Sequence, residues 1–125
     1  MFHANTDVKA VRFQLERRKP YKKEVSPWLN VLYWQEEGSF LAHCLELDIA
    51  AEGATSQEVL RRLAELIVEQ IEFAEGKKID IFHSAPKEFW DKLLEIHLNH
   101  VKQQVYDHPP RSAREILKSS QLVHA

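Results

Sequence analysis

The middle of the chain alternates between apolar and polar stretches in the manner of an antiparallel sheet. Residues 28–36 are rich in aromatic and β-branched side chains, which favour a strand. The polar stretch 36–39 predicts a tight turn, so residues 40–47 are expected to form the second strand of a hairpin. Residues 49–52 predict a short third strand, which Gly53 ends.

Both faces of the predicted sheet are largely apolar. Successive side chains of a strand point to opposite faces, so two sets of residues separate along the second strand. One face carries Phe40, Ala42 and Cys44, and the other carries Leu41, His43 and Leu45. A helix packed on one face leaves the other in need of cover, which indicates oligomerisation or a partner.

A long amphipathic helix follows the sheet. Thr55 and Glu58 have the spacing of a capping box, in which the hydroxyl accepts from the amide three residues on and the glutamate reaches back. Gly76 favours termination, so the helix is predicted from about Ser56 to Glu75. The apolar stripe of this helix has a 3.6-residue period and comprises Val59, Leu60, Leu63, Leu66, Ile67, Ile71 and Ala74.

A second helix is predicted in the last third of the chain. Residues 77–84 form a loop that is expected to tuck against the core through three apolar side chains, Ile79, Ile81 and Phe82. Residues 86–106 form the second amphipathic helix, with its stripe at Phe89, Trp90, Leu93, Leu94, His97 and Val101. The two prolines in 107–110 break this helix, because a residue before proline avoids the α region. Residues 112–118 predict a short last helix.

The N-terminal part has weaker patterns. Residues 8–16 predict either an added strand or a loose arm, and Pro20 and Pro27 bracket a stretch predicted to be a polar linker. The basic cluster at 17–23 could contact nucleic-acid phosphates, but a solvated arm is the favoured interpretation of such a charge run.

Size and composition bound the class of protein. A chain of 125 residues is the length of one domain. It contains no apolar run of the ~18–20 residues that a membrane span needs, and residues 1–12 have no apolar segment typical of a secretory signal. A single cysteine excludes an intramolecular disulfide and a cysteine-rich zinc module. We therefore expect a cytoplasmic protein that does not enter a membrane.

The charge is unevenly distributed along the chain. Residues 1–24 hold seven Lys and Arg against three Asp and Glu, and residues 77–125 hold eight against six. Residues 25–76 hold two against ten, a net charge of -8. An acidic module of this kind repels nucleic acid and suits a basic protein partner.

Glu46, Asp48 and Glu52 lie close together around the turn between the second and third strands, and they are the candidate partner-binding residues. The alternative is a Mg²⁺ site of a nuclease, because that ion takes hard oxygen ligands. A catalytic site of that type draws acids from separated elements, and such a set is not identifiable in the sequence. No catalytic or metal-binding residue is therefore assigned, and no cofactor is expected.

The histidines and the cysteine are expected to be structural. His97 and His100 are three residues apart on a helix and could form half of a zinc or nickel site, but no third ligand has matching spacing. His43 is expected to pack in the core or in an interface. Cys44 points to the opposite face from His43, which disfavours a Cys–His pair, and it is expected to be a small buried hydrophobe.

Residues 38–61 as a whole resemble the HicB-like family. The match consists of a glycine-led strand, a loop, a glycine, a threonine and an acidic residue that opens a helix, at positions Gly38, Phe40, Leu45, Leu47, Gly53, Thr55, Glu58 and Leu63. The resemblance extends over about residues 27–76. It implies an antiparallel sheet with a helix on one face, in a partly degenerate ribonuclease H-like arrangement. It also implies an antitoxin or antitoxin-like protein that binds and blocks a small basic ribonuclease toxin.

The predicted fold is therefore α+β. It consists of an antiparallel sheet of three to four strands with a helix packed on one face, plus a C-terminal helical extension. The predicted organisation is an N-terminal arm or added strand over 1–26, a HicB-like β-β-β-α domain over 27–76 and the helical extension over 77–125. Residues 86–118 contain no helix with clustered Arg, Lys, Asn or Gln, so direct DNA binding by this chain is not expected.

The predicted function is non-enzymatic, HicB-like binding and neutralisation of a small basic ribonuclease toxin. Two alternatives stay open. One is a stand-alone, homo-oligomeric HicB-like protein without a toxin, and the other is a metal-dependent nuclease that uses the acidic loop. In the first two interpretations the chain also binds itself, as a homodimer or a larger assembly.

Overall fold

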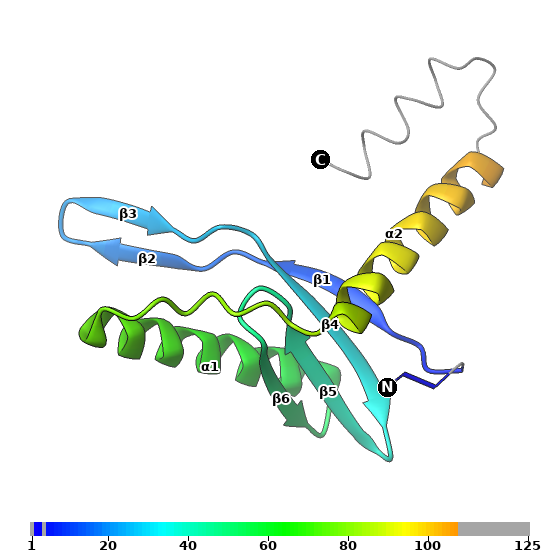
Figure 1. Ribbon diagram of the computed structural model, residues 1–125, viewed down its shortest axis with the longest axis horizontal. Helices are drawn as coiled ribbons and strands as arrows, with labels where there is room; N and C mark the ends of the chain where they lie inside the picture. Colours follow the sequence, from blue (N-terminus) through cyan, green and yellow to red (C-terminus); the bar gives the residue numbers. More distant parts are fainter. Residues whose placement is uncertain (1, 4, 108–125) are drawn as a thin grey trace. The chain divides into compact units, whose positions relative to one another are not determined.

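The computed structural model describes residues 2–3 and 5–107 (Figure 1). The chain forms two compact units, Met1–Trp90 and Asp91–Ala125. The elements are, in order, β1 (Lys9–Phe13), β2 (Glu16–Lys19), β3 (Lys22–Val25), β4 (Leu29–Glu36), β5 (Ser39–Cys44), β6 (Ile49–Gly53), α1 (Ser56–Lys77) and α2 (Lys87–Asp107). The short helix predicted at 112–118 lies outside the described residues. No helix in the described part of the chain is long and apolar enough to cross a bilayer.

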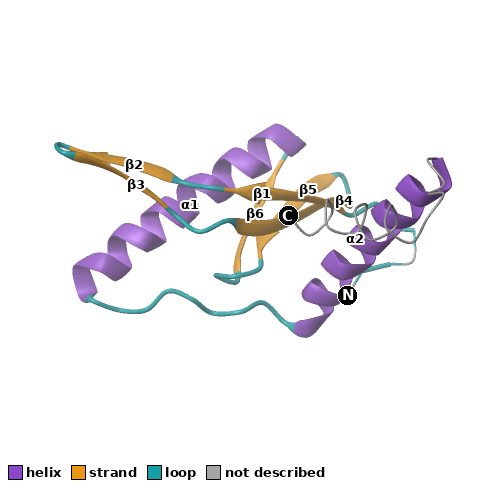
Figure 2. Ribbon diagram, turned by 90° about the horizontal axis from the view of Figure 1, so that it is seen from above, coloured by secondary structure: helices purple, strands orange, loops and turns teal. Residues whose placement is uncertain are grey.

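Four strands form the main sheet, in the order β1-β4-β5-β6, and every neighbouring pair is antiparallel. The predicted α+β class is confirmed, with α1 against the sheet and α2 as a second helix (Figures 1 and 2). Of the two interpretations of residues 8–16, the added strand is correct, because β1 pairs with β4 and places Val11 opposite Val31.

The predicted linker between Pro20 and Pro27 is wrong over most of its length. β2 and β3 form a separate two-stranded antiparallel hairpin, in which Arg17 lies opposite Glu24. Their side chains form an ion pair of 2.9 Å, and Lys23 pairs with Glu16 beside it. Most residues of the two strands are polar and have low strand propensity, so local composition does not predict this hairpin. Ion pairs cross it, but Arg18 also lies opposite Lys23, an unfavourable pair of like charges.

The capping box of α1 forms with one difference from the prediction. The Thr55 hydroxyl accepts from the Glu58 amide at 3.1 Å, while the Glu58 carboxylate accepts from the amide of Ala54, one residue before the cap. The helix also runs two residues past the predicted end at Glu75. Lys78 adopts the left-handed conformation, with φ of 55°, and its amide bonds to carbonyls of the last turn.

Thr55→Ala is expected to lower the free energy of unfolding by about 1 kcal/mol, because it removes the acceptor for an amide at the helix N-terminus. Chemical denaturation monitored by circular dichroism measures the change. Thr55→Ser keeps the acceptor and serves as the control, so an equal loss in both variants would contradict the capping role.

The core lies between α1 and one face of the sheet. Its buried members come from β4, β5, the following turn and α1, and they are Leu29, Val31, Ala42, Cys44, Leu47, Val59, Leu63 and Ile67. The entry into α1 passes very close to the sheet. A Cβ atom at Gly53 would lie 2.9 Å from the backbone nitrogen of Val59, so only glycine fits there without a backbone shift.

The opposite face of the sheet is covered by the first unit's own side chains. Leu32 and Trp34 are buried there. The ring of Phe89, in the first turn of α2, lies 6.3 Å from that of Trp34, and the ring of Phe2 contacts both. The second apolar face therefore has an intramolecular cover at this point, and the need for a partner there, as inferred from the strand pattern, is reduced.

Candidate functional site

The turn that follows β5 holds the first of the three candidate acids. One carboxylate oxygen of Glu46 accepts from the backbone N–H of Asn30 and the other accepts from its side-chain amide, both at 2.7 Å. A backbone bond also joins the turn to β4, because the N–H of Leu45 donates to the Asn30 carbonyl at 2.9 Å. Glu46 thus fastens the turn to the beginning of β4, and its carboxylate is partly buried and bonded.

The second acid, Asp48, is held by a histidine. Asp48 adopts a positive φ of 53°, and one of its carboxylate oxygens lies 2.6 Å from Nε2 of His43. The other oxygen is 3.9 Å from Nε2 of His83. The imidazole of His43 stacks on Phe89 with the ring centroids 4.3 Å apart. The packed position expected for His43 is confirmed, since its side chain is only 14% exposed.

The third acid is in a different environment. Glu52 lies on β6 opposite Leu41, at the edge of the sheet, and its side chain is exposed. Its backbone carbonyl accepts from Arg62 of α1 at 3.4 Å. The three predicted site residues therefore lie on one short segment, but of the three only Glu52 is exposed, while Glu46 and Asp48 are partly buried. In the described part of the chain, no three His, Cys, Asp or Glu side chains are grouped to hold a metal ion.

Sequence reasoning missed the residues that fix this turn. The segment before α2 crosses it, because His83 donates to the Glu46 carbonyl at 3.1 Å and Ala85 donates to the Leu45 carbonyl at 2.8 Å. Asn30 is 16 residues from Glu46, and His83 is farther still. No local spacing relates these positions, so only the folded chain brings them together.

The remaining candidate residues described here are Cys44 and His100. Cys44 is fully buried, and this burial raises its pKa to about 11, so it is a buried hydrophobe as predicted and a poor nucleophile. In α2, Nε2 of His100 lies 3.1 Å from the side-chain nitrogen of Gln104.

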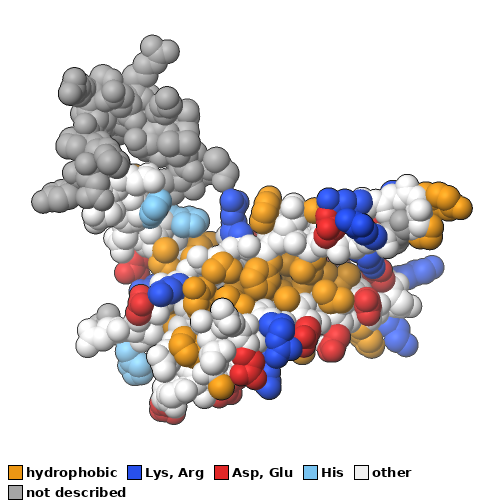
Figure 3. Space-filling view, turned by 180° about the vertical axis from the view of Figure 1, so that it is seen from behind, with side chains coloured by type: hydrophobic (Ala, Val, Ile, Leu, Met, Phe, Trp, Pro, Cys, Tyr) orange, Lys and Arg blue, Asp and Glu red, His pale blue; other side chains and the backbone are white. Residues whose placement is uncertain are grey.

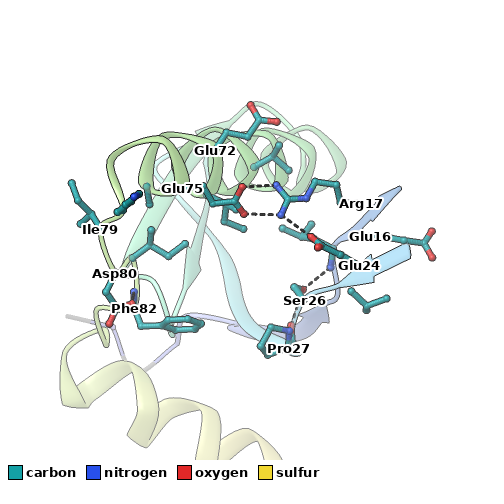
Figure 4. Close-up of a pocket in the computed structure, with 17 residues that line it drawn as sticks. Glu16, Arg17, Glu24, Ser26, Pro27, Glu72, Glu75, Ile79, Asp80 and Phe82 are labelled. Atoms are coloured by element: carbon teal, nitrogen blue, oxygen red, sulfur yellow. Dashed lines mark hydrogen bonds and ion pairs between the residues drawn. The ribbon is translucent and has the colours of Figure 1, made fainter. Parts of the chain in front are cut away.

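A second candidate site is an apolar groove of about 500 Å³ in the first unit. The hairpin β2–β3, the C-terminal half of α1 and the segment 78–82 surround it (Figure 4). Its apolar lining includes Leu15, Val25, Val68, Ile71, Ile79 and Phe82. The sequence feature that corresponds to this groove is the run of apolar residues after α1. That loop was expected to pack inward, but Ile79 and Phe82 are more than half exposed and only Ile81 packs against the core.

An ion-pair cluster lies at the border of this groove. The guanidinium of Arg17 bonds both carboxylate oxygens of Glu75, at 2.6 and 2.8 Å, and also Glu24 at 2.9 Å (Figure 4). These bonds, first with Glu75 and then with Glu24, raise the pKa of Arg17 further above its already high value. Arg17 thereby ties the hairpin to the last turns of α1.

The structure defines the chain as an α+β protein, with a four-stranded antiparallel sheet packed against one helix and followed by a second helix. Comparison with protein-family models, with curated proteins and with solved structures found no match to this chain. The resemblance to the HicB-like family therefore rests on the residue pattern between Gly38 and Leu63 described above.

Proposed function

We propose that this chain is a non-enzymatic, HicB-like protein that binds and neutralises a small basic ribonuclease. The observation that carries the proposal is the succession of β4, β5, β6 and α1 over the residues that resemble the family. Three consecutive antiparallel strands lead directly into a capped helix that packs on one face of their sheet. This is the arrangement that the resemblance implies.

The surface charge supports a basic partner. Glu52 is exposed at the β6 edge, and Glu65, Glu69 and Glu72 are exposed on α1. Exposed carboxylates attract a positively charged protein and raise the rate at which it associates with the surface.

The bonding of the turn favours this function over a nuclease. Magnesium needs several accessible oxygen ligands, whereas the Glu46 carboxylate is bonded twice by Asn30 and Asp48 is bonded by His43. These two acids are better suited to shaping the turn that presents the β6 edge to a partner. The stand-alone homo-oligomer remains the second candidate, and the groove described above favours it.

The test mixes the chain in a stopped-flow experiment with a purified small basic ribonuclease, for which the reading frames next to this gene are searched first. Glu52→Lys is expected to slow association about tenfold at low salt, because it reverses an exposed charge at the proposed contact. Raising the salt concentration is expected to remove most of this difference, since screening shortens the range of the interaction.

Glu69→Lys is the matched control, because it makes the same charge change on the outer face of α1. It is expected to slow association less than Glu52→Lys, and both variants are expected to stay within about 0.5 kcal/mol of the original stability. Failure of a basic partner to bind would contradict the proposal. So would RNA cleavage by the purified chain with Mg²⁺ or Mn²⁺ if Asp48→Asn abolished it.

A further inference from the structure

β2 and β3 continue β1 and β4 as one long two-stranded ribbon (Figure 1). The two strand pairs are joined where the backbone N–H of Ser26 donates to the Leu15 carbonyl at 2.8 Å. Arg17 bonds Glu75 of α1, so its side chain lies on the face of the ribbon toward that helix. Because side chains alternate along a strand, the neighbouring Arg18 lies on the opposite face, which is called the outer face below.

Trp28 and Arg12 form an exposed pair on the outer face. Their neighbours Leu29 and Phe13 pack into the core under α1, so alternation directs Trp28 and Arg12 away from it. The guanidinium carbon of Arg12 lies 5.0 Å from the ring centroid of Trp28, and the tryptophan is 52% exposed. At the tip of the ribbon, Tyr21 is fully exposed. Exposed aromatic rings beside cations are the surfaces on which nucleobases stack.

The positive charge of the outer face is only partly neutralised within the chain. Arg18 lies directly opposite Lys23, and like charges in that position destabilise a strand pair. Lys23 has an acidic partner in Glu16, but in the described part of the chain no carboxylate pairs with Arg18 or with Arg12. An anion bound at Arg18 would therefore relieve its repulsion with Lys23. Figure 3 shows Lys and Arg side chains grouped at the hairpin end of the first unit, next to hydrophobic ones.

The exposed acids of the first unit are mainly on other surfaces. Glu65 and Glu69 are on α1, which packs on the opposite side of the sheet, so they do not face a ligand bound on the outer face. Glu52 is on β6, and β6 and β1 are the two opposite edges of the sheet. The outer face of the ribbon is therefore separate from the proposed contact with a basic ribonuclease.

We propose that the outer face of the ribbon binds single-stranded RNA, with a base stacked on Trp28 and phosphates at Arg12 and Arg18. Proteins bind single strands through aromatic rings placed among cations, because every base has a π face and every nucleotide a phosphate. RNA offers unpaired bases of this kind in its loops and ends. Arg12 and Arg18 are about 20 Å apart along the ribbon, at ~3.3 Å per residue, a length comparable to the ~4 nucleotides of the smallest single-strand sites. Tyr21 stacks a further base at the tip.

Fluorescence anisotropy of the full chain with a labelled oligouridylate of about ten nucleotides tests the proposal. Two phosphate contacts predict a slope of about -1.4 for the logarithm of the affinity against that of the salt concentration, because each contact contributes about -0.7. Arg18→Ala is expected to weaken binding about fivefold at low salt and to reduce the slope to about -0.7. Arg61→Ala is the matched control, because it makes the same charge change at an exposed position of α1 and is expected to leave the slope unchanged.

The aromatic contacts are tested in the same assay. Trp28→Ala is expected to weaken RNA binding about tenfold, whereas Trp28→Phe keeps a ring and is expected to retain most of the affinity. Phe73→Ala is the matched control, because Phe73 is 59% exposed on α1, and it is expected to bind as the unmodified chain does. Tyr21→Ala, at a fully exposed position, is expected to weaken binding about threefold without changing the fold. Circular dichroism shows whether each variant stays folded.

Absence of oligouridylate binding, equal losses in Trp28→Ala and Phe73→Ala, or an unchanged salt slope in Arg18→Ala would each overturn the proposal. Equally tight binding of duplex RNA would do so too, because a duplex offers phosphates without free base faces. Equally tight binding of oligodeoxyuridylate would contradict RNA as the ligand, and equal competition by polyglutamate would indicate an acidic protein instead. Trp28→Ala is expected to associate with the basic ribonuclease at the unmodified rate, so the two proposals fail independently.

Discussion

Phe89→Ala is expected to lower the free energy of unfolding by about 3–5 kcal/mol, the range for removing a buried aromatic ring. Phe89 is only 4% exposed, and its ring contacts Phe2, Trp34 and His43. Its loss leaves a cavity over the second face of the sheet. Denaturant titration followed by circular dichroism measures the change, because fluorescence would combine the emission of Trp28, Trp34 and Trp90.

Leu94→Ala is the control for that experiment. Leu94 is on the same helix but is 54% exposed, so its removal is expected to cost much less, within about 1 kcal/mol. Equal losses in the two variants would contradict the packing of the first turn of α2 on the sheet. The sheet face would then require cover from another molecule, as the strand pattern alone suggested.

Leu63→Ala is expected to cost about 2–5 kcal/mol, because this side chain is fully buried at the centre of the core between α1 and the sheet. The same denaturant titration measures it. Phe73→Ala removes more atoms from the same helix, but from an exposed position, and is expected to change stability by about 0.5 kcal/mol or less. A larger loss for Phe73 than for Leu63 would mean that the buried stripe of α1 is misassigned.

The predictions that the structure confirms concern elements whose signals are local. The stripe through Leu63 and Ile67 repeats at the helical period, and the cap at Thr55 needs only a neighbour three residues away. The turn at Glu37 and Gly38, both at positive φ, likewise lies between two strands of clear composition. The helical stripe, the cap and the turn each involve residues only a few positions apart, so the sequence alone is enough to predict them.

The candidate acids show what local patterns cannot predict, namely whether a carboxylate is bonded or exposed. Spacing predicted Glu46, Asp48 and Glu52 close together, and the structure has the first two in the turn after β5 and Glu52 near the end of β6, opposite Leu41. It could not separate a bonded carboxylate from an exposed one. That difference depends on Asn30 and His43, which approach the turn through strand pairing.

The groove depends on contacts between distant residues, although the hairpin that forms one of its walls pairs residues that are close in sequence. β2 and β3 are mostly polar strands with ion pairs between them, and Arg17 bonds Glu75, which is 58 residues away in the sequence. The groove is lined by the hairpin, α1 and the segment after α1, and the Arg17–Glu75 ion pair links the first two.

By itself, the sequence determined an acidic α+β module with a capped helix on an antiparallel sheet, because hydrophobic period and capping chemistry act over a few residues. Only the tertiary structure decided that β1 extends the sheet, that Phe89 covers its second face and that an apolar groove stays open beside the hairpin. These features arise from burial and ion pairing between residues far apart in the chain. Their free energy depends on distances that no local pattern encodes.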